Sequence, residues 1–181
     1  MKIINISGFA RHGKDTTAEL IKESLESKGK RVLITHYAGL LKFVCSEFLG
    51  WNGKKDGAGR TLLQYVGTDI VRAKDPDYWV NFIADMLGFL GNVGKWDYVL
   101  IPDCRFPNEN ERLKERGFDV KLMKVVRDNF DNGLSDGQQT HESETALNLI
   151  EPDYVILNSG SISDLKEKIN TWIAEELNEK K

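Results

Sequence analysis

The chain has 181 residues, and its 40% hydrophobic content suffices for one sizeable core with little left for a second. The formal net charge is -3, with both signs interleaved, which argues against a surface that binds nucleic acid or anionic lipid. No apolar run is long enough to span a bilayer, and two cysteines without an apolar leader do not indicate a secreted disulfide scaffold. We therefore expect one cytoplasmic domain, residues 1–181, with small-molecule partners and neither nucleic-acid nor membrane partners.

Short apolar runs alternate along the chain with stretches of helical period. Helical spacing is clearest at residues 79–90 and 162–173, and Ser161 and Asp164 form a capping signal before the second stretch. This alternation predicts an α/β fold with a five-stranded parallel sheet and helices on both faces. Runs rich in Val, Ile, Leu or Tyr place the strands at residues 2–7, 31–36, 98–102, 120–126 and 154–157.

Two segments depart from this pattern. Residues 50–59, GWNGKKDGAG, are too rich in glycine for regular structure. Residues 127–145, RDNFDNGLSDGQQTHESET, are polar and nearly free of apolar side chains. Long loops in compact domains are usually functional lids or disordered segments.

The first predicted strand runs into residues 8–17, GFARHGKDTT, which follow the phosphate-binding pattern G-x-x-x-x-G-K-[ST] up to the lysine. Gly8 and Gly13 allow the backbone to curl so that N–H groups face phosphate oxygens, and Lys14 brings a positive charge to the β- and γ-phosphates. A buried strand before the loop and a helix after it complete the pattern. We expect this segment to bind a nucleotide; the alternative is a plain turn with a helix N-cap.

The position after Lys14 normally carries a hydroxyl that contacts magnesium, and here it is Asp15. Thr16 and Thr17 follow directly. Either Asp15, through a water molecule, or Thr16 is expected to hold the ion.

A second acidic residue follows the third predicted strand, in YVLIPDCRFPNENE. Asp103 and then Arg105 leave the strand, and Pro107 opens a helix at a position where proline is tolerated. Ligands of open α/β folds bind at the carboxyl edge of the sheet, so Asp103 is a candidate for the metal's water shell. The alternative is a surface ion pair between Asp103 and Arg105.

Residues 60–72, RTLLQYVGTDIVR, predict an amphipathic helix. Its apolar face would carry Leu62, Leu63, Val66 and Ile70. Its opposite side would carry, at four-residue steps, Arg60, Gln64, Thr68 and Arg72. Two arginines in such a row suit a phosphate, because the planar guanidinium binds phosphate oxygens in pairs, although a solvated helix face is the commoner outcome. Trp79 heads the next apolar stripe and is expected in the core.

Six segments resemble, in order, the deoxynucleoside monophosphate kinases, many of which are encoded by bacteriophages: GFARHGKDTTAELI, YAGLLKFV, GRTLLQYVGTDIVRAKDPDYWV, IPDCRFPNENE, HESE and PDYVILNSGSISDLKEKI. The resemblance implies a three-layer P-loop nucleoside monophosphate kinase-like fold. It also implies transfer of the γ-phosphoryl group of ATP, with Mg²⁺, to a deoxynucleoside 5′-monophosphate in the cytoplasm, which is the host's if a phage encodes the chain. The Gly-Lys-Asp-Thr loop is usual in this family, so Asp15 is a family variant.

Three alternatives stay open beside this resemblance. The Gly-Lys-Asp loop also occurs in animal-type phosphomevalonate kinases, and dephospho-coenzyme A kinases share the general architecture. A nucleotide-binding regulator without catalysis is the alternative from a different functional class. The sequence does not indicate which base or sugar is preferred, and it leaves open whether the chain forms a homodimer.

The resemblance implies an acceptor-binding subdomain at about residues 37–90 and a lid at about residues 127–146. Expected catalytic residues are Lys14, Asp103, Arg105 and Arg127. Expected ATP contacts are Gly8, Arg11, His12, Gly13, Lys14, Asp15, Thr16, Thr17, Asn158 and Gly160, and expected metal contacts are Asp15, Thr16 and Asp103. Expected acceptor contacts are Tyr37, Lys42, Arg60, Gln64, Thr68, Arg72, His141, Ser143 and Glu144. Thr145 replaces the second histidine of the zinc pattern H-E-x-x-H, so zinc is not expected there.

Overall fold

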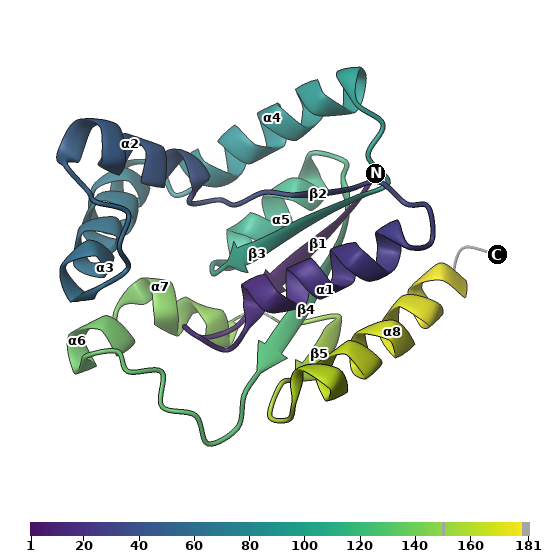
Figure 1. Ribbon diagram of the computed structural model, residues 1–181. Coiled ribbons are helices and arrows are strands. Elements are labelled where there is room, and N and C mark those ends of the chain that lie inside the picture. Colours follow the sequence, from purple (N-terminus) through teal and green to yellow (C-terminus); the bar gives the residue numbers. More distant parts are fainter. Residues whose placement is uncertain (150, 179–181) are drawn as a thin grey trace.

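A computed structural model describes residues 1–149 and 151–178 and shows five parallel strands in one sheet (Figure 1). The strand order is β2-β3-β1-β4-β5. This confirms the predicted five-stranded parallel sheet. The strands are β1 (Lys2–Ser7), β2 (Val32–Ile34), β3 (Tyr98–Cys104), β4 (Asp119–Val126) and β5 (Tyr154–Leu157).

Helices cover both faces of this sheet. Figure 1 shows α1 and α8 on one face and α4 and α5 on the other, with α2 and α3 beyond one end of the sheet and α6 and α7 beside them. The α-helices are α1 (Lys14–Glu26), α2 (Gly39–Leu49), α3 (Gly57–Gln64), α4 (Tyr78–Val93), α5 (Pro107–Glu115), α6 (Asp136–Gln139), α7 (Glu142–Thr145) and α8 (Ile162–Asn178). A π-helix, η1 (Tyr65–Arg72), continues α3, and a 3₁₀ helix, η2 (Ala146–Leu149), continues α7.

The two faces of β1 bury separate hydrophobic clusters, as expected for a strand covered on both sides. Ile4 and Ile6 belong to the cluster formed with α1 and α8, whereas Ile3 belongs to the cluster formed with α4 and α5. Every residue of β1 is buried, and β1 pairs with β3 on one side and β4 on the other. The loop that follows β1 is therefore attached to the most enclosed strand of the sheet.

A third cluster lies under α2, α3 and η1, where Leu41, Cys45 and Trp79 are buried. Trp79 lies in this core, as expected, and its indole N–H donates to the carbonyl of Gly67 at 2.9 Å. The expected apolar face is wrong at one position, because Ile70 is 39% exposed and Val71 packs against the cluster instead. A π-helix forms hydrogen bonds between residues five apart and has a wider turn than an α-helix, so its side chains point in directions that the α-helical spacing does not predict.

Two sequence expectations about irregular segments need correction. The glycine-rich residues 50–59 become helical from Gly57 onward, because the Asp56 carboxylate caps α3 by accepting the N–H of Gly59 at 2.8 Å. The polar residues 127–145 contain the short helices α6 and α7, and Leu134 is buried within them. None of the described helices combines the length and apolar character needed to cross a membrane.

The predicted capping signal before α8 is confirmed. The Asp164 N–H lies 3.2 Å from Ser161 Oγ, and the Asp164 carboxylate accepts the N–H of Ser161 at 2.8 Å. Losing an N-cap hydroxyl costs about 1 kcal/mol, so Ser161→Ala should lower the free energy of unfolding by roughly that amount in urea titrations. Ser163→Ala changes an exposed serine on the same turn and should have little effect; equal losses in both variants would contradict the capping role.

Candidate active site

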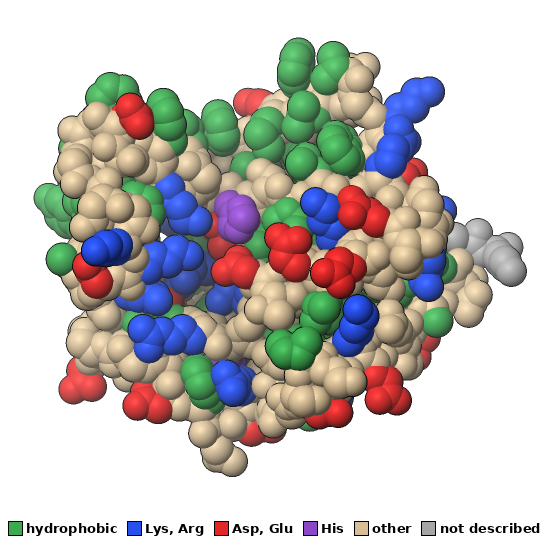
Figure 2. Space-filling model, in the orientation of Figure 1, with side chains coloured by type: hydrophobic (Ala, Val, Ile, Leu, Met, Phe, Trp, Pro, Cys, Tyr) green, Lys and Arg blue, Asp and Glu red, His purple; other side chains and the backbone are tan. Residues whose placement is uncertain are grey.

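The carboxyl ends of the parallel strands place the segments that follow them at one edge of the sheet, and a cavity opens there beside α2 and α3. Lys and Arg side chains gather in this hollow (Figure 2). Its lining comes from the segment after β2, from α3 and η1, from the end of β3, and from the segment around α7. The chain thus brings basic side chains from distant segments to the edge where α/β folds bind ligands.

The loop at residues 8–17 has the backbone that its glycines permit. Gly8 has φ +145° and Gly13 has φ +95°, both in the region that favours glycine. A Cβ on Gly8 would lie 2.4 Å from the carbonyl oxygen of Val125, and one on Gly13 would lie 2.4 Å from Asn158 Nδ2. The loop is therefore seated against the ends of β4 and β5, and no other residue fits at these two positions.

Lys14 turns back over this loop. Its Nζ donates to the carbonyl oxygens of Gly8 at 2.7 Å and Phe9 at 2.9 Å. Burial, followed by the positive charge of Arg105, lowers the pKa of Lys14 to about 8. A phosphate bound at the loop would supply the opposite charge and favour the protonated amine.

His12 and Asn158 hold the loop to its neighbours. His12 Nδ1 accepts the backbone N–H of Arg127 at 3.1 Å, and Asn158 Nδ2 donates to the carbonyl of His12 at 2.9 Å. Burial is the largest of the effects that lower the pKa of His12, which agrees with a neutral ring that accepts a hydrogen bond. These contacts explain why both residues lie at the loop, and their direct contact with ATP stays a prediction.

The residues expected at the metal differ in accessibility. Asp15 and Thr16 are exposed, and Asp15 Oδ1 lies 3.5 Å from His36 Nε2, whose hydrogen bond is the main cause of the lowered pKa of Asp15. Thr17 is fully buried, and its hydroxyl has no hydrogen-bond partner among the residues that the structure describes. Across the described residues, no cluster of three His, Cys, Asp or Glu side chains could hold a metal. This arrangement fits an ion held mainly by phosphate oxygens and water, as is usual for Mg²⁺.

Asp103 lies on a β-bulge. Between Asn5 and Ser7, β1 advances by two residues while its partner β3 advances by three, from Ile101 to Cys104. A bulge redirects side chains at a strand end. The Asp103 carboxylate consequently accepts the backbone N–H groups of Tyr37 at 2.9 Å and Ala38 at 3.0 Å, which fixes it at the cavity wall.

Arg105 pairs with the carboxylate of Glu144, and its Nη1 also donates to the carbonyl of Ser143 at 3.0 Å. The other oxygen of Glu144 accepts the N–H of Ala10 at 3.3 Å. Glu144 therefore joins the phosphate-binding loop, the end of β3 and α7. The sequence alternative of an Asp103–Arg105 ion pair does not match these contacts, because Asp103 and Arg105 have different partners.

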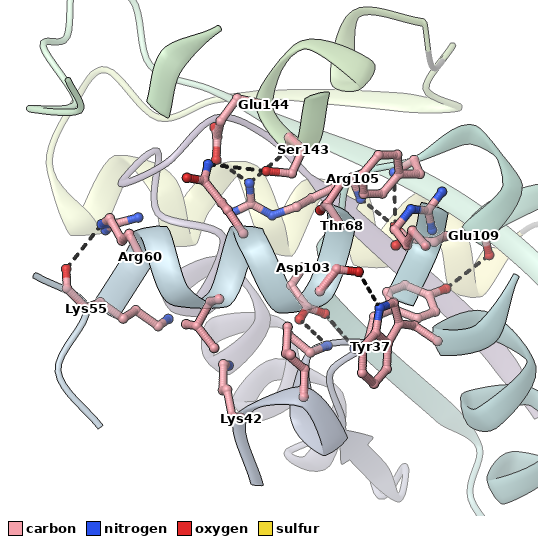
Figure 3. A pocket seen from close by; sticks show the side chains of 18 of the residues that line it. Tyr37, Lys42, Lys55, Arg60, Thr68, Asp103, Arg105, Glu109, Ser143 and Glu144 are labelled. Atoms are coloured by element: carbon pink, nitrogen blue, oxygen red, sulfur yellow. Dashed lines mark hydrogen bonds and ion pairs between the residues drawn. The ribbon is translucent and has the colours of Figure 1, made fainter. Parts of the chain in front are cut away.

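The remaining residues of the HESE segment contact η1 and α3. His141 caps α7, since its Nδ1 accepts the N–H of Ser143 at 3.2 Å, and its Nε2 lies 3.3 Å from Asp69 Oδ1. Gln64 Nε2 lies 3.5 Å from Ser143 Oγ. Residues more than sixty positions apart thus form one wall of the cavity (Figure 3).

The polar side of residues 60–72 lines the cavity as expected, with Arg60, Gln64, Thr68 and Arg72. Tyr37 and Lys42 line the same cavity. Arg72 stacks on the ring of Phe106 with 3.5 Å to the ring centre and donates to Asn108 Oδ1 at 3.0 Å. Arg60 instead donates to the carbonyl of Lys55 at 3.1 Å. The two arginines therefore lie in different surroundings.

A family model described as deoxynucleotide monophosphate kinase matches residues 33–169. The chain belongs to this family. It is 35% identical over 116 residues to the deoxynucleotide monophosphate kinase of Enterobacteria phage T4 and 34% identical over 112 residues to that of Escherichia phage RB69. The matched regions are 63% and 61% of this chain but only 44% and 42% of those relatives, so the chain spans less than half of their length.

Solved structures confirm the expected P-loop kinase-like fold. Shikimate kinase from Aquifex aeolicus superposes with a TM-score of 0.54, at 11% identity and over 97% of this chain and 98% of that one. The APS kinase of Mycobacterium tuberculosis gives 0.53, at 12% identity and over 96% and 97%. At identities this low, the superpositions show that the fold is shared and nothing more.

Twelve expected residues of this deoxynucleotide monophosphate kinase family member lie outside the cavity lining: Gly8, Arg11, His12, Gly13, Lys14, Asp15, Thr16, Thr17, Arg127, His141, Asn158 and Gly160. Arg127 is exposed, and its guanidinium stacks over the ring of Phe130 at 4.1 Å from the ring centre. Gly160 precedes α8, where a Cβ would lie 2.5 Å from Asp164 Oδ2. Their expected roles in catalysis and ATP binding stay predictions.

Sequence reasoning did not select two charged residues that line the cavity, Lys55 and Glu109. Lys55 belongs to the glycine-rich segment, which matches no motif. Glu109 is buried, and its carboxylate accepts the N–H groups of Arg105 at 2.6 Å and Phe106 at 3.1 Å. The sequence did contain a signal for this contact: Glu109 is an acidic residue in the first turn of a helix that begins at Pro107, a position from which it can cap the helix.

The burial of Glu109 predicts a pH dependence of stability. Complete burial raises the pKa of its carboxyl to about 7, from 4.5, although the two N–H groups act in the opposite direction. The folded protein keeps this proton where the unfolded chain has lost it, so stability from this group falls as pH rises from about 4.5 to 7. Glu109→Gln cannot ionise and should lose less stability than the wild type between about pH 5 and pH 8, measured by urea unfolding.

Glu111→Gln, which changes an exposed glutamate of the same helix, is the matched control and should follow the wild type. A wild-type profile that matches Glu109→Gln would show that Glu109 titrates normally.

Proposed function

We propose that this family member transfers the γ-phosphoryl group of ATP to a deoxynucleoside 5′-monophosphate, giving ADP and a deoxynucleoside diphosphate. The observation that carries the proposal is one cavity in which Arg105, next to the phosphate-binding loop through Glu144, faces a wall formed by Lys42, Arg60 and Arg72. Such a cavity suits two phosphate-bearing ligands that meet end to end. We further propose that residues 37–90 bind the acceptor, that residues 127–146 act as a lid, and that the reaction occurs in the cytoplasm.

The chemistry requires positioning more than proton transfer. The acceptor phosphate is already anionic at neutral pH, so its oxygen can attack the γ-phosphorus without a general base. Lys14 and Arg105 would then stabilise the charge that develops on the transferred group. Mg²⁺ would be held by the ATP phosphates with Asp15, Thr16 and Asp103 close to its water shell, and it would neutralise phosphate charge.

Asp103 distinguishes this reaction from phosphorylation of a hydroxyl. A hydroxyl acceptor, such as dephospho-coenzyme A, requires a base to remove its proton. Both oxygens of Asp103 already accept backbone N–H groups. These contacts support a role of Asp103 in orienting the ion's water shell. An anionic acceptor phosphate does not require Asp103 to accept a proton.

A panel of acceptors in an ADP-release assay tests the proposal directly. A deoxynucleoside monophosphate should give the highest kcat/KM among the four common deoxynucleotides, the ribonucleotides, phosphomevalonate and dephospho-coenzyme A. Lys14→Ala should remain folded and lose roughly 100-fold or more of the rate, because it removes a fixed charge at the transferred phosphate. A preference for phosphomevalonate or dephospho-coenzyme A, or no acceptor-dependent ADP at all, would overturn the proposal.

Arg105 gives a second test. Arg105→Ala should lower kcat/KM for the acceptor by roughly 10² or more while the affinity for ATP changes little, because its forked donor acts on developing charge. Arg105→Lys should recover only part of the loss, since it keeps the charge but loses paired hydrogen bonds. Normal acceptor kinetics in Arg105→Ala would contradict the catalytic role and leave Arg105 only its ion pair with Glu144.

A further inference from the structure

Lys55 lies in a loop that the surrounding structure holds firmly. The indole N–H of Trp51 donates to the carbonyl of Lys54 at 2.9 Å, and Arg60 donates to the carbonyl of Lys55 at 3.1 Å. A Cβ on Gly59 would lie 2.1 Å from the Lys54 carbonyl and 2.8 Å from Trp51 Nε1, so only glycine allows α3 to approach the loop this closely. The backbone on both sides of Lys55 is therefore anchored.

The ammonium groups of Lys55 and Lys42 form no direct ion pair with any residue that the structure describes. Within residues 1–149 and 151–178, neither Nζ takes part in a hydrogen bond or ion pair, although both side chains line the cavity. Partial removal from water and the charge of Lys42 are the main causes that lower the pKa of Lys55, and Arg60 acts in the same direction. The acids that face Lys55 are Asp15 and Asp103. Both attract Lys55 without forming an ion pair with it: Asp15 lies beside His36, and Asp103 accepts two backbone N–H groups.

Lys55 is exposed and Lys42 half-buried, so water solvates both, but two ammonium groups together at a cavity wall create a positive potential that attracts an anion. We propose that Lys55, together with Lys42, binds the phosphate of the acceptor, a contact that no sequence motif marks. Both lysines lie on the chain between β2 and β3, with Arg60, whereas the phosphate-binding loop and Lys14 already serve the donor. Figure 3 shows Lys55 and Arg60 at the same end of the cavity, with Lys42 nearby and Asp103 beyond them. This inference rests on the proposed transfer to a nucleoside monophosphate.

The chain provides a matched control, because Lys54 is the adjacent lysine and its side chain does not line the cavity. Lys55→Ala should raise KM for the best deoxynucleoside monophosphate by roughly 10-fold, the loss of one charge-assisted phosphate contact, with KM for ATP unchanged. Lys54→Ala should stay within about twofold of the wild type, and Lys55→Arg should retain most of the affinity. Urea unfolding of each variant checks that the fold is intact.

Equilibrium binding separates the phosphate contact from other effects. Lys55→Ala should weaken binding of the monophosphate and leave binding of the corresponding deoxynucleoside, which has no phosphate, unchanged. Equal behaviour of Lys55→Ala and Lys54→Ala in an enzyme that phosphorylates deoxynucleotides would overturn this inference and leave the proposed function in place. A raised KM for ATP alone would likewise overturn it, by placing Lys55 at the donor. A wild-type protein that neither binds nor phosphorylates any deoxynucleoside monophosphate would overturn both.

Discussion

The carboxylate of Glu144 is the contact on which the arrangement of the cavity depends. It joins the N–H of Ala10 in the phosphate-binding loop to Arg105 after β3, and it brings α7 with it. A buried carboxylate without partners is costly, so these segments are stable in this position only together. Their donors are also those that a phosphate would use. A phosphate bound near Ala10 and Arg105 would compete with Glu144 for these donors.

The polar side chains of residues 60–72 all line the cavity, although the segment changes from the α-helix α3 to the π-helix η1. A four-residue step exceeds one turn of the α-helix, which has 3.6 residues, and falls short of the wider turn of a π-helix. The two deviations have opposite signs, so Arg60 and Gln64 in α3 and Thr68 and Arg72 in η1 stay on one side. On the apolar side, both Val66 and Val71 pack against the third cluster. The indole of Trp79 supplies a donor to the Gly67 carbonyl within this irregular turn.

Local patterns were sufficient to predict the sheet, the phosphate-binding loop and the polar row. Gly8, Gly13 and Lys14 are recognisable because short spacing alone defines their geometry. Contacts between distant segments carry no such pattern, which is why Lys55 was not selected, and why the partner of Arg105 was not recognised. Strand β2 covers only the apolar residues Val32–Ile34 of the predicted range 31–36, and it lies at the edge of the sheet, where it pairs only with β3. Ile70 and Val71 were exchanged because nothing in the sequence announced a π-helix.

The cations of the site fall into two groups with different energetics. Lys14 and Arg105 have protein partners, namely loop carbonyls and Glu144, so their positions are set before any ligand binds. Fixed donors of this kind need little reorganisation as charge develops, which favours a role in the chemical step. Lys42 and Lys55 form no ion pair with any described residue, and ordering their long side chains on a bound anion would reduce the net gain. The cavity thus combines preorganised donors near the phosphate-binding loop with lysines on the α2–α3 side that are free to pair with a bound anion.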